Sequence, residues 1–362
     1  MASARAKRLL RMGASLLIAG GFLALVVRGL DWGGVGEVLR TSRVELLAPV
    51  LVLLVLHYAL KGLRWRVLLA EEIDVPRLLA VRLVFVGFLM NNFLPARAGE
   101  LGRPYLLVAN HPGARFSFAL ATMLGVKLFD LLFVVLCLLA SAMVLELPAF
   151  AHTGILVLSV LSLGALATGV VAARWIEADR RRDGKGILYG LMERSLGGRA
   201  PQVYDTALHF AAGLATMSRP RAFLAACGYT AASFALLAVA LLLCMEMVHV
   251  PGGVEHTVFV MGMIGIGFTI PAPPTGAGNY HWFASQALLL TGVAGPEAAF
   301  GFALIAHITQ VIANSAGGLL SLIGLDWKKP PAEPQGSMIQ RRGVDAPRSK
   351  LTIKESPKTQ KM

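Results

Sequence analysis

Positive charge is absent from a long part of the chain, because no lysine or arginine occurs between Arg221 and Lys328. Charged residues of either sign make up only 15% of the 362 residues, whereas soluble domains carry roughly a quarter. A helix needs about 20 mostly apolar residues to cross a bilayer, and several stretches here reach that length. The sequence therefore predicts an all-α integral membrane protein.

Features of common enzymes are also missing. The three cysteines, Cys137, Cys227 and Cys244, lie inside apolar stretches without paired spacing, so neither a disulfide framework nor a metal site is expected. The sequence has no zinc-protease His-Glu-x-x-His, no phosphate-binding glycine loop and no nucleophile elbow. No polar segment is long enough for a soluble catalytic domain. We therefore expect a non-enzymatic protein with no catalytic residue, metal or cofactor.

The net charge of +13 is concentrated at the N-terminus, in a central segment and in the C-terminal tail, next to apolar stretches. Basic residues flanking membrane spans usually face the cytoplasm, so this pattern indicates a membrane surface and no nucleic-acid partner. We expect a multi-pass protein of the bacterial inner membrane with both termini cytoplasmic. Residues 1–325 would form the membrane domain, and residues 326–362 a disordered basic tail.

Six full spans are expected, and the charged residues between them suggest which ends face the cytoplasm. Lys61, Arg64 and Arg66 directly follow the second span and are interpreted as its cytoplasmic flank. Residues 174–220 form a polar cytoplasmic loop with two amphipathic stretches, 187–196 and 203–217, which we expect to lie on the membrane surface. The six spans cover approximately residues 12–27, 44–60, 116–145, 154–173, 222–247 and 298–325.

Two further apolar runs, starting near residues 78 and 258, are broken by helix-disrupting residues. If the first run crossed the membrane fully, Arg97, Arg103 and Arg115 would lie outside, against the positive-inside rule. We therefore expect the two runs to be re-entrant hairpins that enter from opposite faces, within an inverted repeat. Paired broken segments of this kind mark the substrate site of many transporters. The residues expected to break the helices are Pro95, Gly99, Pro271, Pro274, Gly276 and Gly278.

The first break carries the residues most suited to a ligand. The arginine fork of Arg97 or Arg103 matches the geometry of a phosphate, and Glu100 could orient the arginines or regulate release. The alternative is an interfacial salt-bridge cluster that fixes the turn. Asn92 and its neighbour Asn91 could bind the same ligand or cap the broken helix. In the second break, His281 is the candidate, because a histidine could titrate near neutral pH.

Two polar groups lie within the expected spans. Lys127 and Asp130 are three residues apart and are expected to pair on one helix, either as a packing device or as a group that gates or relays charge. His307, Gln310 and Asn314 form one polar face of the last span. Hydrogen bonding between helices is the more common use of such a face, and ligand contact is the other.

The run NNFLPARAGELGRPYLL, residues 91–107, resembles the signature of the lysylphosphatidylglycerol synthase transmembrane-region family, also called flippase-like domain proteins. The family pattern of Asn, Pro-x-Arg-x-Gly-Glu and a later Arg matches Asn92, Pro95, Arg97, Gly99, Glu100 and Arg103. A second family motif resembles residues 270–283, with Thr275 at its first glycine and His281 at its glutamate. The resemblance implies a lipid-handling membrane module, without the soluble lysyl-transferring domain that some members carry.

Two functions agree with these observations. The first is a lipid transporter or flippase for an anionic phospholipid or a polyprenyl-phosphate headgroup, bound by Asn92, Arg97, Glu100, Arg103 and His281. The second is a non-transporting membrane scaffold for a lipid- or glycan-modifying enzyme, docked through residues 174–220. Membrane lipids are the expected partners in the first case, and a membrane enzyme is the partner in the second.

Overall fold

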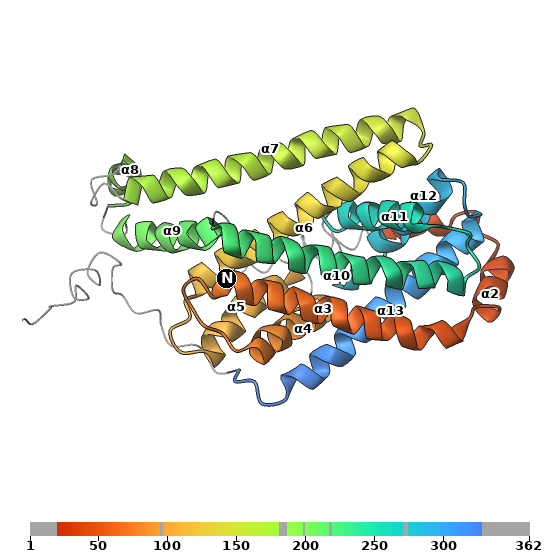
Figure 1. Cartoon of the computed structure of the whole chain (residues 1–362), viewed down its shortest axis with the longest axis horizontal. Helices are drawn as coiled ribbons and strands as arrows, with labels where there is room; N and C mark the ends of the chain where they lie inside the picture. The colour runs from red at the N-terminus through yellow and green to blue at the C-terminus, as the bar shows by residue number, and fades with distance from the viewer. Residues whose placement is uncertain are drawn as a thin grey trace, which may run out of the picture.

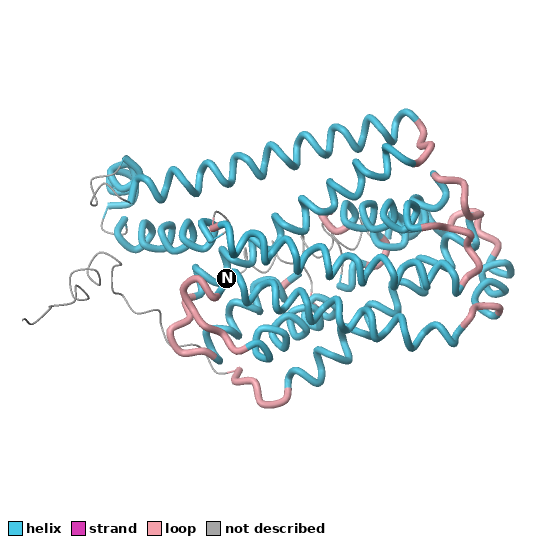
Figure 2. Tube along the Cα trace, in the orientation of Figure 1, coloured by secondary structure: helices cyan, strands magenta, loops and turns pink. Residues whose placement is uncertain are grey.

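The computed structural model describes residues 20–94, 97–180, 187–197, 200–216, 219–270 and 274–327, and within them every regular element is a helix (Figures 1 and 2). Most of the expected first span, the tail from residue 328, Pro95 and Pro271 lie outside these residues. The helices are α2 (Trp32–Arg40), α3 (Leu47–Leu69), α4 (Arg77–Phe93), α5 (Gly99–Asn110), α6 (Phe116–Val144), α7 (Ala149–Arg180), α8 (Ile187–Leu196), α9 (Ala200–Ala215), α10 (Pro220–Met247), α11 (Val254–Gly267), α12 (Asn279–Leu290) and α13 (Pro296–Leu322), with short 3-10 helices at Val44–Leu46 and Pro274–Gly276.

Five helices in the described residues are long and apolar enough to cross a bilayer, and they coincide with five of the six expected spans. The all-α, multi-pass membrane architecture predicted from the sequence is confirmed. The second span differs in one respect, since α3 continues to Leu69. Lys61 and Arg64 therefore lie within this helix, and interpreting them as a flank outside the span was wrong. The five segments are Val44–Leu69, Phe116–Val144, Ala149–Gly169, Pro220–Met247 and Pro296–Leu322.

The two amphipathic stretches of the central loop form α8 and α9, close to the expected boundaries. Helix α9 packs against α6 and α7. Gly213 permits this contact, because a side chain there would meet the backbone oxygen of Phe118 and the methyl group of Ala121. One side of α9 is therefore covered by protein, and its position on the membrane surface stays a prediction.

The first broken segment doubles back on itself, so that α4 and α5 form an antiparallel pair. His111, just after α5, contacts the backbone oxygen of Asp74 at 3.0 Å, and Asp74 lies just before α4. The start of α4 and the end of α5 therefore lie at the same end of the helical bundle. Gly99 lies against the backbone oxygen of Gly87, so the arms approach too closely for a side chain at the contact.

The second broken segment also doubles back, with α11 packed against α12. The Asn279 side chain joins the arms by donating a 3.2 Å hydrogen bond to the backbone oxygen of Gly267. In Figure 1 the α4–α5 pair lies left of centre and the α11–α12 pair lies right of centre. Their opposed placement agrees with hairpins entering from opposite faces, and re-entry into a membrane stays a prediction.

Helices from the two halves of the chain pack in a repeated pattern. Helix α3 packs along α10, α4 packs on α13, and α11 packs on α6. In the expected repeat α3 corresponds to α10, α4 to α11 and α6 to α13, so the second and third contacts are equivalent. Glycines allow both of these helix contacts. Gly318 of α13 packs directly against the Leu89 side chain of α4, and Gly262 of α11 packs directly against the Leu138 side chain of α6. The packing therefore brings the two broken segments together at the centre.

Replacing Gly99 with alanine should destabilise the protein by about 1–3 kcal/mol, the usual effect of overpacking a tight contact. The added methyl group would press on the Gly87 backbone oxygen and on the Asn91 side chain. Thermal unfolding in detergent would measure the change. Gly228→Ala is the matched control, because a methyl group on that α10 glycine meets nothing within 4 Å. If the unfolding temperature of Gly99→Ala equals that of Gly228→Ala, the close contact between Gly99 and Gly87 is contradicted.

Candidate functional site between the two helix breaks

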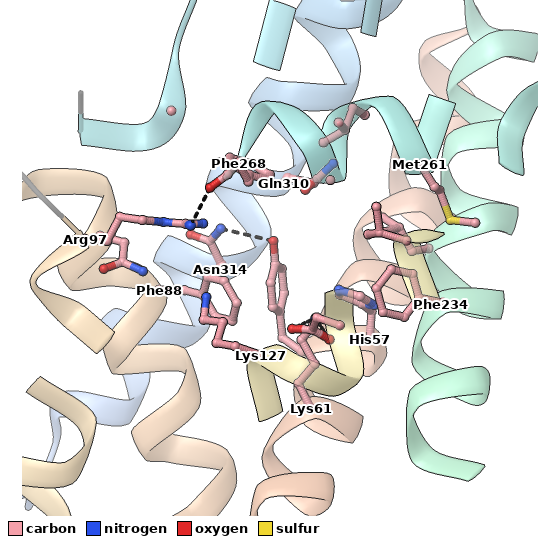
Figure 3. A pocket seen from close by; sticks show the side chains of 18 of the residues that line it. His57, Lys61, Phe88, Arg97, Lys127, Phe234, Met261, Phe268, Gln310 and Asn314 are labelled. Atoms are coloured by element: carbon pink, nitrogen blue, oxygen red, sulfur yellow. Dashed lines mark hydrogen bonds and ion pairs between the residues drawn. The ribbon is translucent and has the colours of Figure 1, made fainter. Parts of the chain in front are cut away.

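A cavity of about 480 Å³ lies where the two breaks meet. The Arg97 side chain reaches from the first break to the second, where its Nη1 donates a 2.7 Å hydrogen bond to the backbone oxygen of Phe268 (Figure 3). The same guanidinium group lies 5.3 Å from the centre of the Phe268 ring. The breaks therefore form one site together. The first contributes Asn91, Asn92 and Arg97 to the cavity wall, and the second contributes Phe268, Thr269, Thr275 and Gly276.

Both breaks hold a non-glycine residue in the left-handed backbone region. Arg97 has φ of 54° and Thr275 has φ of 66°. Such residues are uncommon because the Cβ atom crowds the backbone, and they tend to occur at functional sites. Gly276 and Gly278 also have positive φ values, of 77° and 86°. The second break is therefore a true interruption of the helix, as the sequence predicted for these glycines.

Glu100 stands at the centre of the first group of charges. Its carboxylate lies 2.6 Å from the Lys127 ammonium group and 3.4 Å from Nε of Arg97. Lys127 and Arg97 both line the cavity. Glu100 also lies in the first turn of α5, where the helix dipole favours a negative charge. One carboxylate is thus shared by two cations that face the cavity.

Asp130 stands at the centre of a second, more buried group. Its Oδ1 lies 2.8 Å from Nη1 of Arg64 and 3.4 Å from the Lys61 ammonium group. The Arg64 side chain is fully buried and also donates a 2.9 Å hydrogen bond to Thr230. The expected pair between Lys127 and Asp130 is therefore wrong. Each residue takes its partner from another segment, because α3 and α5 bring Arg64, Lys61 and Glu100 against α6.

Arg103 lies behind the cavity wall, 5% exposed, with its guanidinium group 4.4 Å from the centre of the Phe88 ring. Its Nε has no hydrogen-bond partner among the described residues. The side chain rests against Gly87, where any Cβ atom would collide with it. Arg103 therefore adds a buried positive charge beside the cavity, with the aromatic ring providing part of its stabilisation.

Neutral polar side chains link three helices on one side of the cavity. Nδ2 of Asn92 donates to Oδ1 of Asn314 at 2.5 Å, and Nδ2 of Asn314 donates to the Tyr58 hydroxyl oxygen at 3.2 Å. Because the Tyr58 oxygen accepts this bond, its hydrogen is available to an acceptor in the cavity. Asn91 caps the first break by accepting a 2.9 Å hydrogen bond from the Gly99 backbone.

Histidines form a second polar chain at the other break. Nε2 of His281 lies 3.3 Å from Nδ1 of His307, and Nε2 of His307 lies 3.1 Å from the backbone oxygen of Thr275. The Gly278 backbone also donates to Nδ1 of His281 at 3.4 Å. His307 lines the cavity and His281 stands behind it. The chain therefore fixes the second break onto α13.

The five residues expected to bind substrate occupy two layers. Asn92 and Arg97 line the cavity. Glu100, Arg103 and His281 lie behind its wall, and each contacts at least one residue of the lining. The structure adds residues on α3 that the sequence interpretation either left unassigned or placed in a cytoplasmic flank. They share a signal, since they recur on one helix face within an apolar run. These residues are His57, Tyr58 and Lys61, with Arg64 one turn further along.

A family model described as the lysylphosphatidylglycerol synthase TM region matches residues 12–318. The chain belongs to this family. The match extends from before α2 into the last turns of α13, which ends at Leu322, and it supports a membrane protein with a lipid-related function. No curated protein and no solved structure matches the chain.

Proposed function

We propose that the protein transports an anionic lipid across the membrane, and that the headgroup passes through the cavity between the two breaks. The observation that carries the proposal is an excess of positive charge around this cavity. The lipid-related family and the meeting of two broken segments at one site support it. Transport needs only binding and conformational change, so the proposal assigns no catalytic role, cofactor or metal.

The charge excess follows from the ion pairs. Five cationic side chains and two carboxylates surround the cavity, so three positive charges have no counter-charge among them. Removing an unpaired charge from water is expensive, and charged residues within membrane segments usually mark a substrate path. An anionic headgroup would supply the missing negative charge. The cations are Lys61, Arg64, Arg97, Arg103 and Lys127, and the carboxylates are Glu100 and Asp130.

The depth of the site also supports transport. Asp130 is the middle residue of the 29-residue helix α6, so each end of the helix is about 21 Å away at 1.5 Å per residue. The hydrocarbon core of a bilayer is about 30 Å thick. With α6 spanning the membrane, the charges would lie near the midplane, where a transporter holds its substrate.

The orientation proposed from the sequence remains our proposal. At one end of the bundle, Arg219 pairs with Glu71 and Arg66 pairs with Asp74. Further arginines, Arg77, Arg82 and Arg115, stand near the helix termini at this end. The positive-inside rule would place this end in the cytoplasm of a bacterial inner membrane.

Replacing Arg97 with glutamine should slow movement of an anionic lipid at least tenfold. Hydrogen bonds to charged groups contribute about 1.5–3 kcal/mol, and each 1.4 kcal/mol corresponds to a factor of about ten. Fluorescent phosphatidylglycerol and phosphatidylethanolamine in proteoliposomes would measure the rate. Arg40→Gln is the matched control, because the Arg40 side chain is 77% exposed on α2.

Unchanged movement in Arg97→Gln, with the protein still folded, would contradict the proposal. Binding of anionic lipid by the unaltered protein without any movement would instead favour the non-transporting scaffold. In that case, deletion of residues 187–215 should release a membrane enzyme that otherwise co-purifies.

A further inference from the structure

We infer that the cavity selects a lipid whose headgroup ends in a multiply charged phosphate, namely a phosphate monoester or a diphosphate. Ordinary phospholipids such as phosphatidylglycerol carry a phosphodiester with one negative charge. The inference rests on the proposed function and adds the charge state of the substrate. It follows from how the two carboxylates divide their contacts among the cations.

Each carboxylate is close to one cation and further from another. Glu100 lies 2.6 Å from Lys127 but 3.4 Å from Arg97. Asp130 lies 2.8 Å from Arg64 but 3.4 Å from Lys61. Arg97 and Lys61 are therefore the less neutralised members of their groups, and both line the cavity. Two separate positive charges face the space that a headgroup would fill.

A third positive charge stands behind these two. Arg103 is buried beside Phe88 and has no carboxylate within ion-pair distance among the described residues. A phosphodiester would neutralise one of the three excess charges and leave two. A monoester, whose second pKa is near 6, brings about two negative charges at neutral pH, and a diphosphate brings more. Because unpaired charges interact strongly at low dielectric, the multiply charged group is favoured.

The hydrogen-bond donors of the cavity match the same chemistry. A terminal phosphate has three exposed oxygens, whereas a diester has two that carry charge. Arg97, Lys61 and Lys127 present charged donors from three segments of the chain, and Tyr58 presents a hydroxyl hydrogen. Four donors arranged around one space would satisfy a terminal phosphate more fully than a diester.

The rest of the cavity wall favours a lipid as the carrier of this phosphate over a free anion. Apolar side chains from α4, α6, α10, α11 and α13 contribute to the wall, including Phe88, Leu128, Leu237, Met261 and Val311. A free phosphate would leave these groups facing water, while a lipid chain would cover them. Figure 3 shows Phe88 beside Lys127, and the Lys61 ammonium group lies 5.1 Å from the centre of the Phe234 ring.

The test compares lipids of different headgroup charge in nanodiscs at pH 8. Phosphatidic acid should bind about tenfold or more tightly than phosphatidylglycerol at equal mole fraction, and farnesyl diphosphate should compete with it. Lys61→Gln removes one facing charge and should reduce this preference about tenfold. Lys127→Gln, at a more exposed position, serves as a second variant if Lys61→Gln fails to fold. Arg40→Gln should keep the full preference.

Equal binding of phosphatidic acid and phosphatidylglycerol by the unaltered protein would overturn the inference and leave the proposed function standing. Tight binding of inorganic pyrophosphate, with no preference among the lipids, would overturn the lipid as carrier. Movement of neither lipid in proteoliposomes, despite selective binding, would overturn the proposed function and leave the selectivity intact.

Discussion

Replacing Asp130 with asparagine should destabilise the protein by about 3–5 kcal/mol. Removing one partner of a buried ion pair leaves the other charge uncompensated, and losses of this size are typical. Here two cations lose their counter-charge, because Arg64 is fully buried and the Lys61 side chain is 13% exposed. Thermal unfolding in detergent, read by loss of helical signal, would measure the decrease.

Asp74→Asn is the matched control for this substitution. Asp74 also pairs with an arginine, Arg66, but its side chain is 87% exposed, so its loss should change stability by less than about 1 kcal/mol. The double variant Arg64→Met with Asp130→Asn should lose less than the two single variants combined, because the buried arginine charge is gone. Equal stability of Asp130→Asn and Asp74→Asn would contradict the burial of this charge group.

Unlike Asp130→Asn, replacing Glu100 with glutamine should reduce stability only slightly and change the binding and release of the ligand strongly. Glu100 also serves two cations, but Arg97 and Lys127 are each 37% exposed, so stability should fall by only about 1 kcal/mol. The cavity gains one net positive charge. Binding of an anionic lipid should tighten about tenfold and its release should slow.

Equilibrium binding in nanodiscs and the rate of lipid movement in proteoliposomes would separate the two effects. Glu37→Gln provides a control, because Glu37 is an exposed carboxylate paired with Arg40 on α2, away from the cavity. Weaker binding by Glu100→Gln would mean that the carboxylate holds the two cations in position for the headgroup. That result would contradict its role as a competitor for the two cations.

The fold was largely predictable because membrane helices depend on length and apolarity, which are local properties of sequence. The boundaries of α6 and α10 follow from long, mostly apolar runs, of which the first contains only Lys127 and Asp130 as charged residues. The break at Gly276 and Gly278 follows from residues that disrupt helices in any context. Arg97 was identified as a candidate binding residue for a related reason, because an arginine beside a helix break within an apolar region is suited to hold an anionic ligand.

Partners across the bundle were not predictable from local sequence. Lys61 follows an apolar run, so it resembles an interfacial flank until the helix is seen to continue to Leu69. Asp130 has a lysine three residues earlier, and only tertiary packing shows that Arg64 approaches it more closely. Two features of the sequence indicate this charge group, namely a carboxylate within an apolar helix and a polar face on α3.

The glycine contacts of the first hairpin also constrain how the protein can move. Gly99 fits against Gly87, Gly318 of α13 fits against Leu89 of α4, and Gly62 of α3 fits against the backbone of Val81 of α4, so a side chain at any of these glycines would push the helices apart. Helices α3, α4, α5 and α13 are therefore tightly packed together, although α13 is encoded some 200 residues away from α4 and α5. We expect a substrate that widens the cavity to move these four helices together.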